Sequence, residues 1–303
     1  MGGVAYVVMA HTGPAAVAAR VRRLRELAPL SHVLVRSAGS LLSDADAQDL
    51  GIALLRSEIR VQWGDWSLTA AAVETFSTAQ RLWDPDHVVL VSGQDHPVTD
   101  LAVWESGLDG VDAVLRRDPR DHAERWRSCW HVLPAQSALD TLWWGLSRVS
   151  ARVGSSRGID RAGDRTWVAR HPRPGGPPVP YVKGSFWCVL SRAALTAVVE
   201  AAADPRVGGW FATTLLPDES FVHSVLAARP DLRTVAGATS FTVFPTVGSA
   251  HPRELGADDV NAALAGGAPF ARKVVGVDGE FTRRVDAAVD ALVRPGACVR
   301  PPA

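Results

Sequence analysis

The sequence predicts an α/β fold in which an open, mainly parallel sheet is flanked by helices. Short, continuous apolar runs recur along the chain, and such runs are typical of strands that are buried on both faces of a parallel sheet. Between them lie segments whose apolar residues recur every three or four positions, as on one face of an amphipathic helix. The two signals alternate over most of the chain, which is the pattern of βαβ units.

The first βαβ unit is predicted at the beginning of the chain. Residues 4–10 are an apolar run, and His11-Thr-Gly-Pro14 turns from it into a helix. The apolar positions of that helix are Val17, Val21, Leu24 and Leu27. A second strand follows at 32–35. Because ligands of open α/β sheets bind at the carboxyl ends of strands, His11 and Arg36 are candidate site residues.

The next elements continue the alternation. The loop 63–67 precedes a long helix predicted at 68–82, and residues 86–92 are the clearest strand of the chain. That strand ends in Gly93-Gln-Asp95, which places Asp95 at another carboxyl edge. A short helix at 99–106 and a strand at 113–115 complete this half.

Residues 116–180 differ in character. Arg, Asp, Trp and His are frequent at the start of this segment, Trp143-Trp144 lies on an expected helix, and 170–180 is a loop rich in Pro and Gly. We expect little regular structure here. A long segment of this kind suggests a lid or a partner-binding region.

Polar residues that could take part in binding or catalysis reappear after this segment. Lys183, Gly184 and Ser185 lead into an apolar strand that contains Trp187, and a helix is predicted from Ser191. Further on, Asp218 and Glu219 are adjacent carboxylates after Pro217, at the predicted first turn of another helix, where backbone amides stabilise negative charge. Together these residues indicate a polar small-molecule site, and an N-capped helix beside a buried strand is the alternative. The last predicted elements are a strand at 241–244, helices at 258–264 and 280–293, and a Pro-rich tail.

Composition narrows the class of protein. The 303 residues carry 32 Lys and Arg against 32 Asp and Glu, so no net charge favours nucleic acid. Lys183 and Lys273 are the two lysines of the chain. Three widely spaced cysteines predict no disulfide framework, and the sequence has no signal peptide pattern and no apolar run long enough to span a membrane. We therefore expect a cytoplasmic protein without a membrane span or a nucleic-acid partner.

Several common chemistries lack their motifs. The sequence contains no G-x-G-x-x-G after the first strand, no G-x-x-x-x-G-K-[ST], no G-x-S-x-G and no H-E-x-x-H. Asp44-Ala-Asp46 matches the D-x-D pattern that holds Mg²⁺ or Mn²⁺ in many glycosyltransferases, but it follows Ser43 instead of a buried strand. A capping turn is the preferred interpretation of these residues, and no metal site is expected.

Six sequence blocks occur in the order in which they occur in one enzyme family. They are Tyr6-Val-Val-Met-Ala-His11, Val89-Leu-Val-Ser-Gly-Gln-Asp-His-Pro97 with Trp63-Gly64 and Ser67 upstream, Lys183-Gly-Ser-Phe-Trp187, Pro217-Asp-Glu219, His251-Pro-Arg-Glu-Leu255 and Phe270-Ala-Arg-Lys273. The ordered set resembles the core-2/I-branching N-acetylglucosaminyltransferase and peptide-O-xylosyltransferase family, glycosyltransferase family 14. The resemblance covers most of residues 4–275.

The resemblance implies a GT-A-type fold and an activity. A single domain would span 1–295, with a tail at 296–303. Within that domain, 1–115 would be the nucleotide-sugar-binding half, 116–180 a variable acceptor or lid segment, and 181–295 the catalytic and phosphate-binding half. The implied reaction is an inverting, metal-independent transfer of a sugar (GlcNAc, Glc, Xyl or GlcA class) from a UDP-sugar to a hydroxyl of a carbohydrate or small-molecule acceptor, with a β-linked product and no cofactor.

The resemblance also implies residue roles. Glu219 would be the general base, and the basic residues at the donor diphosphate would be Arg253, Lys273 and Arg272. Candidates for contacts with the donor nucleoside or sugar are His11, Arg36 and Asp95. Candidates for contacts with the sugar or acceptor are Lys183, Ser185, Trp187, Trp63 and Asp218. Each has a structural alternative, namely capping, core packing or an exposed turn.

Some positions depart from the family pattern. The family's second strand usually ends in an aspartate that contacts the nucleoside, and Arg36 stands there, so different nucleoside contacts are expected. The block F-A-R-K-F reads F-A-R-K-V. The chain has neither the membrane anchor nor the cysteine pairs of eukaryotic relatives and resembles a compact, bacterial-type member. A non-catalytic carbohydrate-binding protein with the same fold is the competing hypothesis, and a nucleotide-processing hydrolase is a third.

Overall fold

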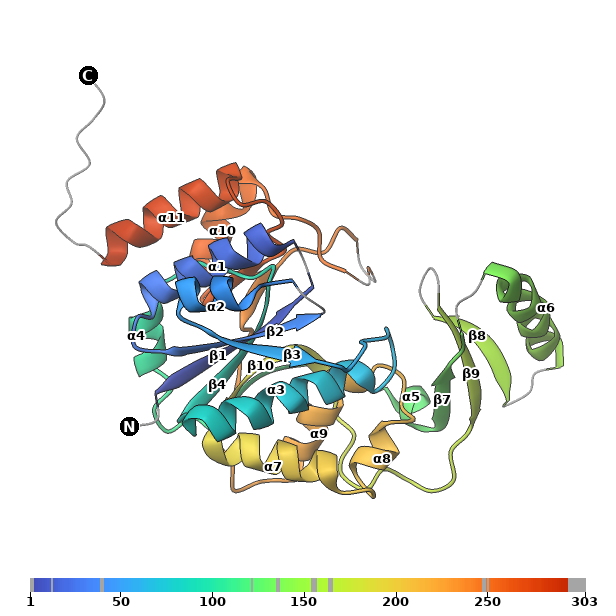
Figure 1. Cartoon of the computed structure of the whole chain (residues 1–303). Coiled ribbons are helices and arrows are strands. Elements are labelled where there is room, and N and C mark those ends of the chain that lie inside the picture. Colours follow the sequence, from blue (N-terminus) through green and yellow to red (C-terminus); the bar gives the residue numbers. More distant parts are fainter. Residues whose placement is uncertain are drawn as a thin grey trace.

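A computed structural model describes residues 3–11, 13–38, 41–120, 122–134, 137–153, 157–162, 166–246, 249 and 251–293 (Figure 1). Within these ranges the chain forms a central seven-stranded sheet in the order β11-β6-β10-β4-β1-β2-β3. Its strands are β1 (Val4–Ala10), β2 (His32–Ala38), β3 (Ala53–Ser57), β4 (His87–Ser92), β6 (Ala113–Arg117), β10 (Gly184–Ser191) and β11 (Thr234–Ala236). The predicted tail at 296–303 lies outside the described residues.

The sheet is mainly parallel, as predicted. Strand β1 pairs in parallel with β2 and β4, β2 pairs in parallel with β3, and β11 pairs in parallel with β6. Strand β10 is antiparallel to both of its neighbours, β4 and β6. The chain leaves the sheet at the carboxyl end of β6 and returns at the same edge, so β10 must run in the opposite direction. Consequently the first residues of β10 lie at the edge where open α/β sheets bind ligands.

Helices cover both faces of the sheet (Figure 1). One face is covered by α1 (Pro14–Leu27), α4 (Leu101–Ser106), α10 (Val260–Ala265) and α11 (Glu280–Val293), and the other by α3 (Ser67–Trp83), α7 (Arg192–Ala203) and α9 (Phe221–Ala227). Successive residues of β1 alternate between the two cores, because side chains of a strand point to opposite faces. Tyr6 and Val8 belong to one core, and Ala5 and Val7 belong to the other.

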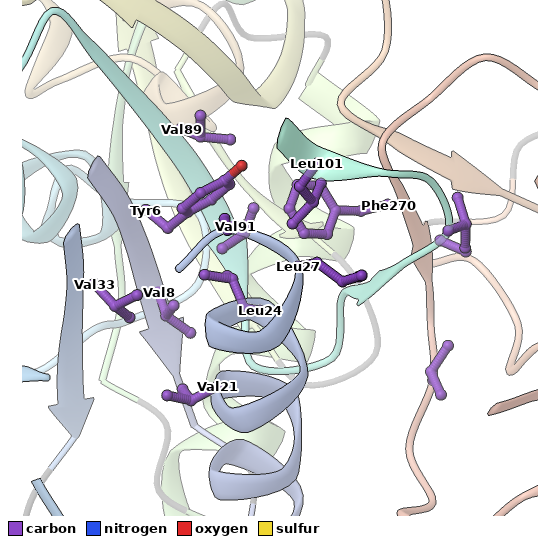
Figure 2. Packing of buried hydrophobic residues seen from close by; sticks show 14 of the residues in the cluster. Tyr6, Val8, Val21, Leu24, Leu27, Val33, Val89, Val91, Leu101 and Phe270 are labelled. Atoms are coloured by element: carbon purple, nitrogen blue, oxygen red, sulfur yellow. The ribbon is translucent and has the colours of Figure 1, made fainter. Parts of the chain in front are cut away.

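The core between α1 and the sheet is built from the residues that the helical spacing predicted. Val17, Val21, Leu24 and Leu27 are all buried. Figure 2 shows Val21, Leu24 and Leu27 turned toward the strands, near Tyr6, Val8 and Val91. Phe270 closes this core from the far side, and its ring meets that of Tyr6 edge-on with centroids 5.9 Å apart. The predicted first βαβ unit is therefore confirmed.

A small second sheet extends the carboxyl edge. Its strands are β12 (Ser240–Thr242), β13 (Phe270–Arg272) and β5 (His96–Pro97), in that order. Strand β13 is antiparallel to β5, which directly follows Asp95, and parallel to β12. This sheet thus brings the C-terminal basic residues beside the end of β4.

Residues 116–180 contain more regular structure than predicted, and the expectation for this segment is wrong. An antiparallel sheet in the order β7-β9-β8 projects from the body of the protein and carries helix α6 (Figure 1). These elements are β7 (Ser128–Val132), α6 (Ser137–Val153), β8 (Gly158–Ala162) and β9 (Thr166–Pro172), which we call the projecting unit. Strands β8 and β9 mix charged, aromatic and small residues and contain no continuous apolar run, so the sequence contains no clear indication of them. The expected helix at Trp143-Trp144 is confirmed.

Arg173 fastens the projecting unit to the body. Its Nε donates to the carbonyl of Trp126 at 3.0 Å, and its Nη2 donates to the carbonyl of Thr213 at 2.8 Å. Its guanidinium also lies over the ring of Trp210, 4.1 Å from the centroid. One arginine therefore joins the chain before β7 to the loop after α8 (Gly208–Phe211).

The remaining elements are short. They are α2 (Asp44–Leu50), α5 (Ala123–Trp126) and two 3-10 turns at Pro217–Glu219 and Ala257–Asp259. The predicted helix at Pro217 thus begins with a 3-10 turn, and α9 follows at Phe221. Among the described residues, no helix has the length and apolar character needed to cross a membrane.

Candidate active site

Lys183 and Glu219 form an ion pair at the carboxyl edge of the sheet. Lys183 immediately precedes β10, and Glu219 lies in the 3-10 turn before α9. The Nζ of Lys183 is 2.8 Å from Oε2 of Glu219 and 3.9 Å from Oδ2 of Asp118. The N–H of Asp118 donates to the carbonyl of Lys183 at 2.8 Å, so the end of β6 fixes the start of β10. The two motifs that the sequence singled out therefore meet.

The backbone of the turn at Pro217–Glu219 is held by a distant loop. Leu216, which precedes the turn, has φ of 53°, a left-handed conformation that is uncommon for a residue with a side chain. Its N–H donates to the carbonyl of Gly64 at 3.0 Å. This hydrogen bond places the loop that carries Trp63, an exposed side chain, next to the carboxylates.

Asp218 and Glu219 lie in different environments. Burial, followed by the negative charge of Glu219, raises the pKa of Asp218 to about 7 from its ordinary 3.8, although Lys183 and Arg125 lower it. Glu219 is partly exposed and pairs with Lys183. Pairs of carboxyl groups whose environments differ in this way are a common feature of sites for proton transfer.

His223 is a residue of this site that the sequence analysis missed. It is buried one helical turn after Glu219, and its Nε2 donates to the carbonyl of Ser185 at 2.8 Å. A Cβ at Gly184 would overlap with the imidazole of His223 and with the carbonyl of Arg116. The glycine between Lys183 and Ser185 is therefore required by the close approach of α9. The sequence could have indicated His223, because it follows Glu219 by four residues, which is one turn of a helix.

A cluster of positive charge lies further along β10. Arg272, at the end of β13, has its Nη1 3.7 Å from Oδ2 of Asp95, and its guanidinium lies over the ring of Trp187, 4.3 Å from the centroid. Asp95 is buried. Its carboxylate accepts hydrogen bonds from the N–H of Ser92 at 2.6 Å and from the hydroxyl of Ser240 at 3.2 Å. The Arg272 Nη1 is itself buried and forms no hydrogen bond within the described part of the chain.

The electrostatics of this cluster indicate an excess of positive charge. Burial and then the charge of Arg272 lower the pKa of Lys273. Burial, Arg272 and Lys273 together lower the pKa of His11, which directly follows β1. Burial raises the pKa of Asp95 despite the opposing effect of Arg272. An anion bound here would relieve the repulsion between these cations.

Strand β10 connects the carboxylates to the cations. Lys183 precedes the strand at the carboxylate side, and Trp187 lies under Arg272. Between them, the hydroxyl of Ser185 accepts the N–H of Trp187 at 3.3 Å. The structure thus brings most of the candidate residues to one edge of the sheet.

Arg253 and Arg36 have other partners. Arg253 makes a bidentate ion pair with Asp259, with distances of 2.8 and 2.7 Å, although its carbonyl accepts the N–H of Lys273 at 3.4 Å. Arg36 is buried, donates to the carbonyl of Ile59 at 2.6 Å and lies 3.6 Å from Glu74. The guanidinium groups of both residues are thus held by neighbours that belong neither to the Lys183–Glu219 pair nor to the Arg272–Lys273 cluster.

Asp44 and Asp46 lie at the start of α2. Asp46 and Ser43 form a capping box, in which the Ser43 hydroxyl accepts the N–H of Asp46 and the Asp46 carboxylate accepts the N–H of Ser43. The preferred interpretation of these residues as a capping turn is confirmed. In the ranges that the structure describes, no group of three or more His, Cys, Asp or Glu side chains is arranged to hold a metal ion.

An open α/β sheet with a carboxylate and a cluster of cations at its carboxyl edge is consistent with a GT-A-type fold, because ligands of such sheets bind at that edge. Comparison with protein families supports this class. The family model of the core-2/I-branching enzymes matches residues 4–264, and the chain belongs to that family. The expected family and the expected glycosyltransferase activity are therefore confirmed. No curated protein matches the chain.

Proposed function

We propose that this glycosyltransferase moves a sugar from a UDP-sugar to a hydroxyl group of a carbohydrate or small-molecule acceptor, with inversion and without a metal ion. Glu219 would be the general base, and Arg272 and Lys273 would bind the diphosphate. Donors of the GlcNAc, Glc, Xyl or GlcA class are all compatible with these roles. The proposal rests on family membership and on the placement of the Lys183–Glu219 pair and the Arg272–Lys273 cations at the carboxyl edge of the central sheet.

The observation that carries the proposal is the unbalanced positive charge at Arg272 and Lys273. Two cations and one buried carboxyl group of raised pKa leave a net attraction for an anion. The buried Nη1 of Arg272 has no hydrogen-bond acceptor among the described residues. A diphosphate supplies several acceptor oxygens and two negative charges, so it would satisfy both requirements. Cations fixed in this way replace the role that a metal ion has at other diphosphates.

Glu219 suits the role of base by its exposure and by its contact with Lys183. An inverting displacement needs a carboxylate that takes the proton of the acceptor hydroxyl while its oxygen attacks the anomeric carbon. The diphosphate leaves as an anion paired with Arg272 and Lys273, so the leaving group needs no protein acid. The Lys183 ion pair, at 2.8 Å, orients the carboxylate. General-base assistance contributes roughly 10² to 10⁴ in rate.

The test of the base is Glu219→Gln in the full chain. We expect kcat to fall by about 10² to 10⁴ while binding of UDP, measured by calorimetry, changes little, because the base lies outside the cation cluster. Turnover is measured as UDP released from a panel of UDP-sugars with EDTA present. Turnover of Glu219→Gln near that of the unchanged protein would refute the assignment.

Diphosphate binding is tested by Lys273→Ala, with Arg253→Ala as the matched control. Loss of Lys273 removes a cation from the cluster and should weaken UDP binding by about tenfold or more, at roughly 1.5–3 kcal/mol for a hydrogen bond to a charged group. Arg253→Ala should weaken it less, because its guanidinium is held by Asp259. Equal losses would place Arg253 at the diphosphate as well.

A carbohydrate-binding protein without transfer is the second candidate. The buried Arg36, hydrogen-bonded to Ser57 and Ile59, stands where the family has a nucleoside-binding aspartate. This alternative expects glycan binding without affinity for UDP. The thermal unfolding temperature with and without UDP separates the two, because a ligand of the folded state raises it.

A further inference from the structure

Helix α6 presents an apolar stripe to solvent. Leu142, Leu146, Val149 and Val153 are 50%, 41%, 58% and 72% exposed. Their spacing of four, three and four residues places them along one side of the helix. A typical surface helix would bury such a stripe against its own protein, so this one needs another explanation.

A different side of α6 packs on the projecting sheet. The hydroxyl of Ser150 accepts the N–H of Ile159, in β8, at 3.4 Å. Nearby, the Nε1 of Trp143 donates to the carbonyl of Pro134, in the loop after β7, at 3.3 Å. Asp140 accepts Nε1–H of Trp167 at 3.1 Å on this side. The stripe is therefore additional to the face that holds the helix in place.

By helical spacing, the charged side chains of α6 on the side away from the projecting sheet are positive. Arg148 lies over the ring of Trp144, with its guanidinium carbon 5.3 Å from the centroid, and Arg152 follows one turn later. Neither arginine forms an ion pair within the part of the chain that the structure describes. The carboxylate of the helix, Asp140, is engaged with Trp167 on the sheet side. A surface that covers the stripe should therefore be apolar, with negative charge on the side of the helix that carries the two arginines.

The position of α6 favours a broad, flat surface. The helix lies at the outer end of the projecting unit, far from the central sheet (Figure 1). We propose that α6 docks on an anionic lipid bilayer, with the stripe between the acyl chains and headgroups and with Arg148 and Arg152 at the phosphates. Helices with this arrangement of apolar and basic residues bind in the plane of the membrane interface.

A second copy of the chain fits the stripe less well. The four side chains expose on the order of 400 Å² per copy, so a symmetric pair would bury about 800 Å², which is the size of a crystal contact and below that of a stable dimer. Pairing the helices would also bring the arginines of two copies together without carboxylates between them. A lipid surface meets neither objection.

The test is sedimentation of the full-length chain with vesicles of phosphatidylcholine, with or without phosphatidylglycerol. We expect binding to the anionic vesicles, and weaker binding at high salt. The double variant Leu146→Glu with Val149→Glu should reduce the partition coefficient by at least about tenfold. Neutralising Arg148 and Arg152 with Gln should reduce it by about fivefold for each residue. Leu30→Glu, at a residue that is 93% exposed in the turn after α1, is the matched control and should bind normally.

Both sets of variants change exposed side chains, so thermal unfolding should be unaltered and will confirm that they fold. Absence of binding to anionic vesicles would overturn the proposal, as would equal binding of the double variant and the unchanged chain. A dimer in sedimentation velocity that the double variant abolishes, without vesicle binding, would assign the stripe to a second copy instead. Turnover of soluble substrates is independent of this test, so a failure here leaves the proposed function standing.

Discussion

Asp218→Asn should remove a pH dependence of stability that originates at the candidate active site. In the folded protein, burial and the charge of Glu219 raise the pKa of Asp218 from 3.8 to about 7. Well below pH 3.8 the group is protonated in both the folded and the unfolded chain. As the pH rises toward 7, the unfolded chain ionises while the folded one retains the proton, so the free energy of unfolding falls.

The magnitude follows from the two pKa values. A rise from 3.8 to about 7 corresponds to a loss of at most about 4 kcal/mol of unfolding free energy, complete only above pH 7. The Asp218 side chain keeps partial contact with solvent, which screens its charge, so we expect about 2–3 kcal/mol in practice. Asparagine has a similar shape and does not ionise. Relative to the unchanged protein, Asp218→Asn should therefore be more stable at pH 8 than at pH 4.5 by this amount.

Urea unfolding at the two pH values measures the effect, with Asp231→Asn as the control. Asp231 is exposed and paired with Arg229, and its pKa is lowered, so its substitution should produce no gain at pH 8. A difference between pH values below about 0.5 kcal/mol for Asp218→Asn would refute the reasoning, because that is the size of an ordinary surface change. Turnover of the same variant adds a second result. If Asp218→Asn abolished transfer and Glu219→Gln did not, Asp218 would be the base.

Two further predictions concern the scaffold of the site. Gly184→Ala should destabilise the fold by about 1–3 kcal/mol, because the added methyl group overlaps with the His223 ring and the Arg116 carbonyl. Urea unfolding measures this loss of stability. The control is Gly209→Ala, where the new methyl group meets open space. Arg173→Lys should loosen the projecting unit without loss of charge, because lysine cannot reach the carbonyls of Trp126 and Thr213 at once. We expect faster proteolysis within 128–172. An unchanged rate of proteolysis would contradict the role of this contact.

The elements that could be predicted from the sequence are those in which the residues of a strand, or the residues on one face of a helix, are mostly apolar and buried. Residues 4–10, the helix face at Val17 to Leu27 and the closing helix at 280–293 were all located, because their apolar patterns match one period. The direction of β10 was not predicted, because an apolar run has the same appearance in parallel and antiparallel strands. Strands β7, β8 and β9 were missed, since they carry polar and aromatic residues with only one covered face.

Site residues could be predicted where the family motif contains them and where a pair of motifs meets in space. Lys183 and Glu219 are examples, and their 2.8 Å contact joins two blocks that are far apart in the chain. The partners of Arg253 and Arg36 could not be predicted, because a guanidinium at the right edge of a sheet can turn toward a neighbouring carboxylate. Asp259 and Glu74 are those carboxylates, and no motif contains them.

The return of the chain to the same edge of the sheet has an evolutionary consequence. Between β6 and β10, residues 118–183 leave and re-enter beside each other, since the N–H of Asp118 donates to the carbonyl of Lys183. An excursion closed in this way can grow, shrink or be exchanged without shifting the register of the central strands. New binding surfaces can therefore be acquired by insertion at this point, while the central sheet keeps its geometry.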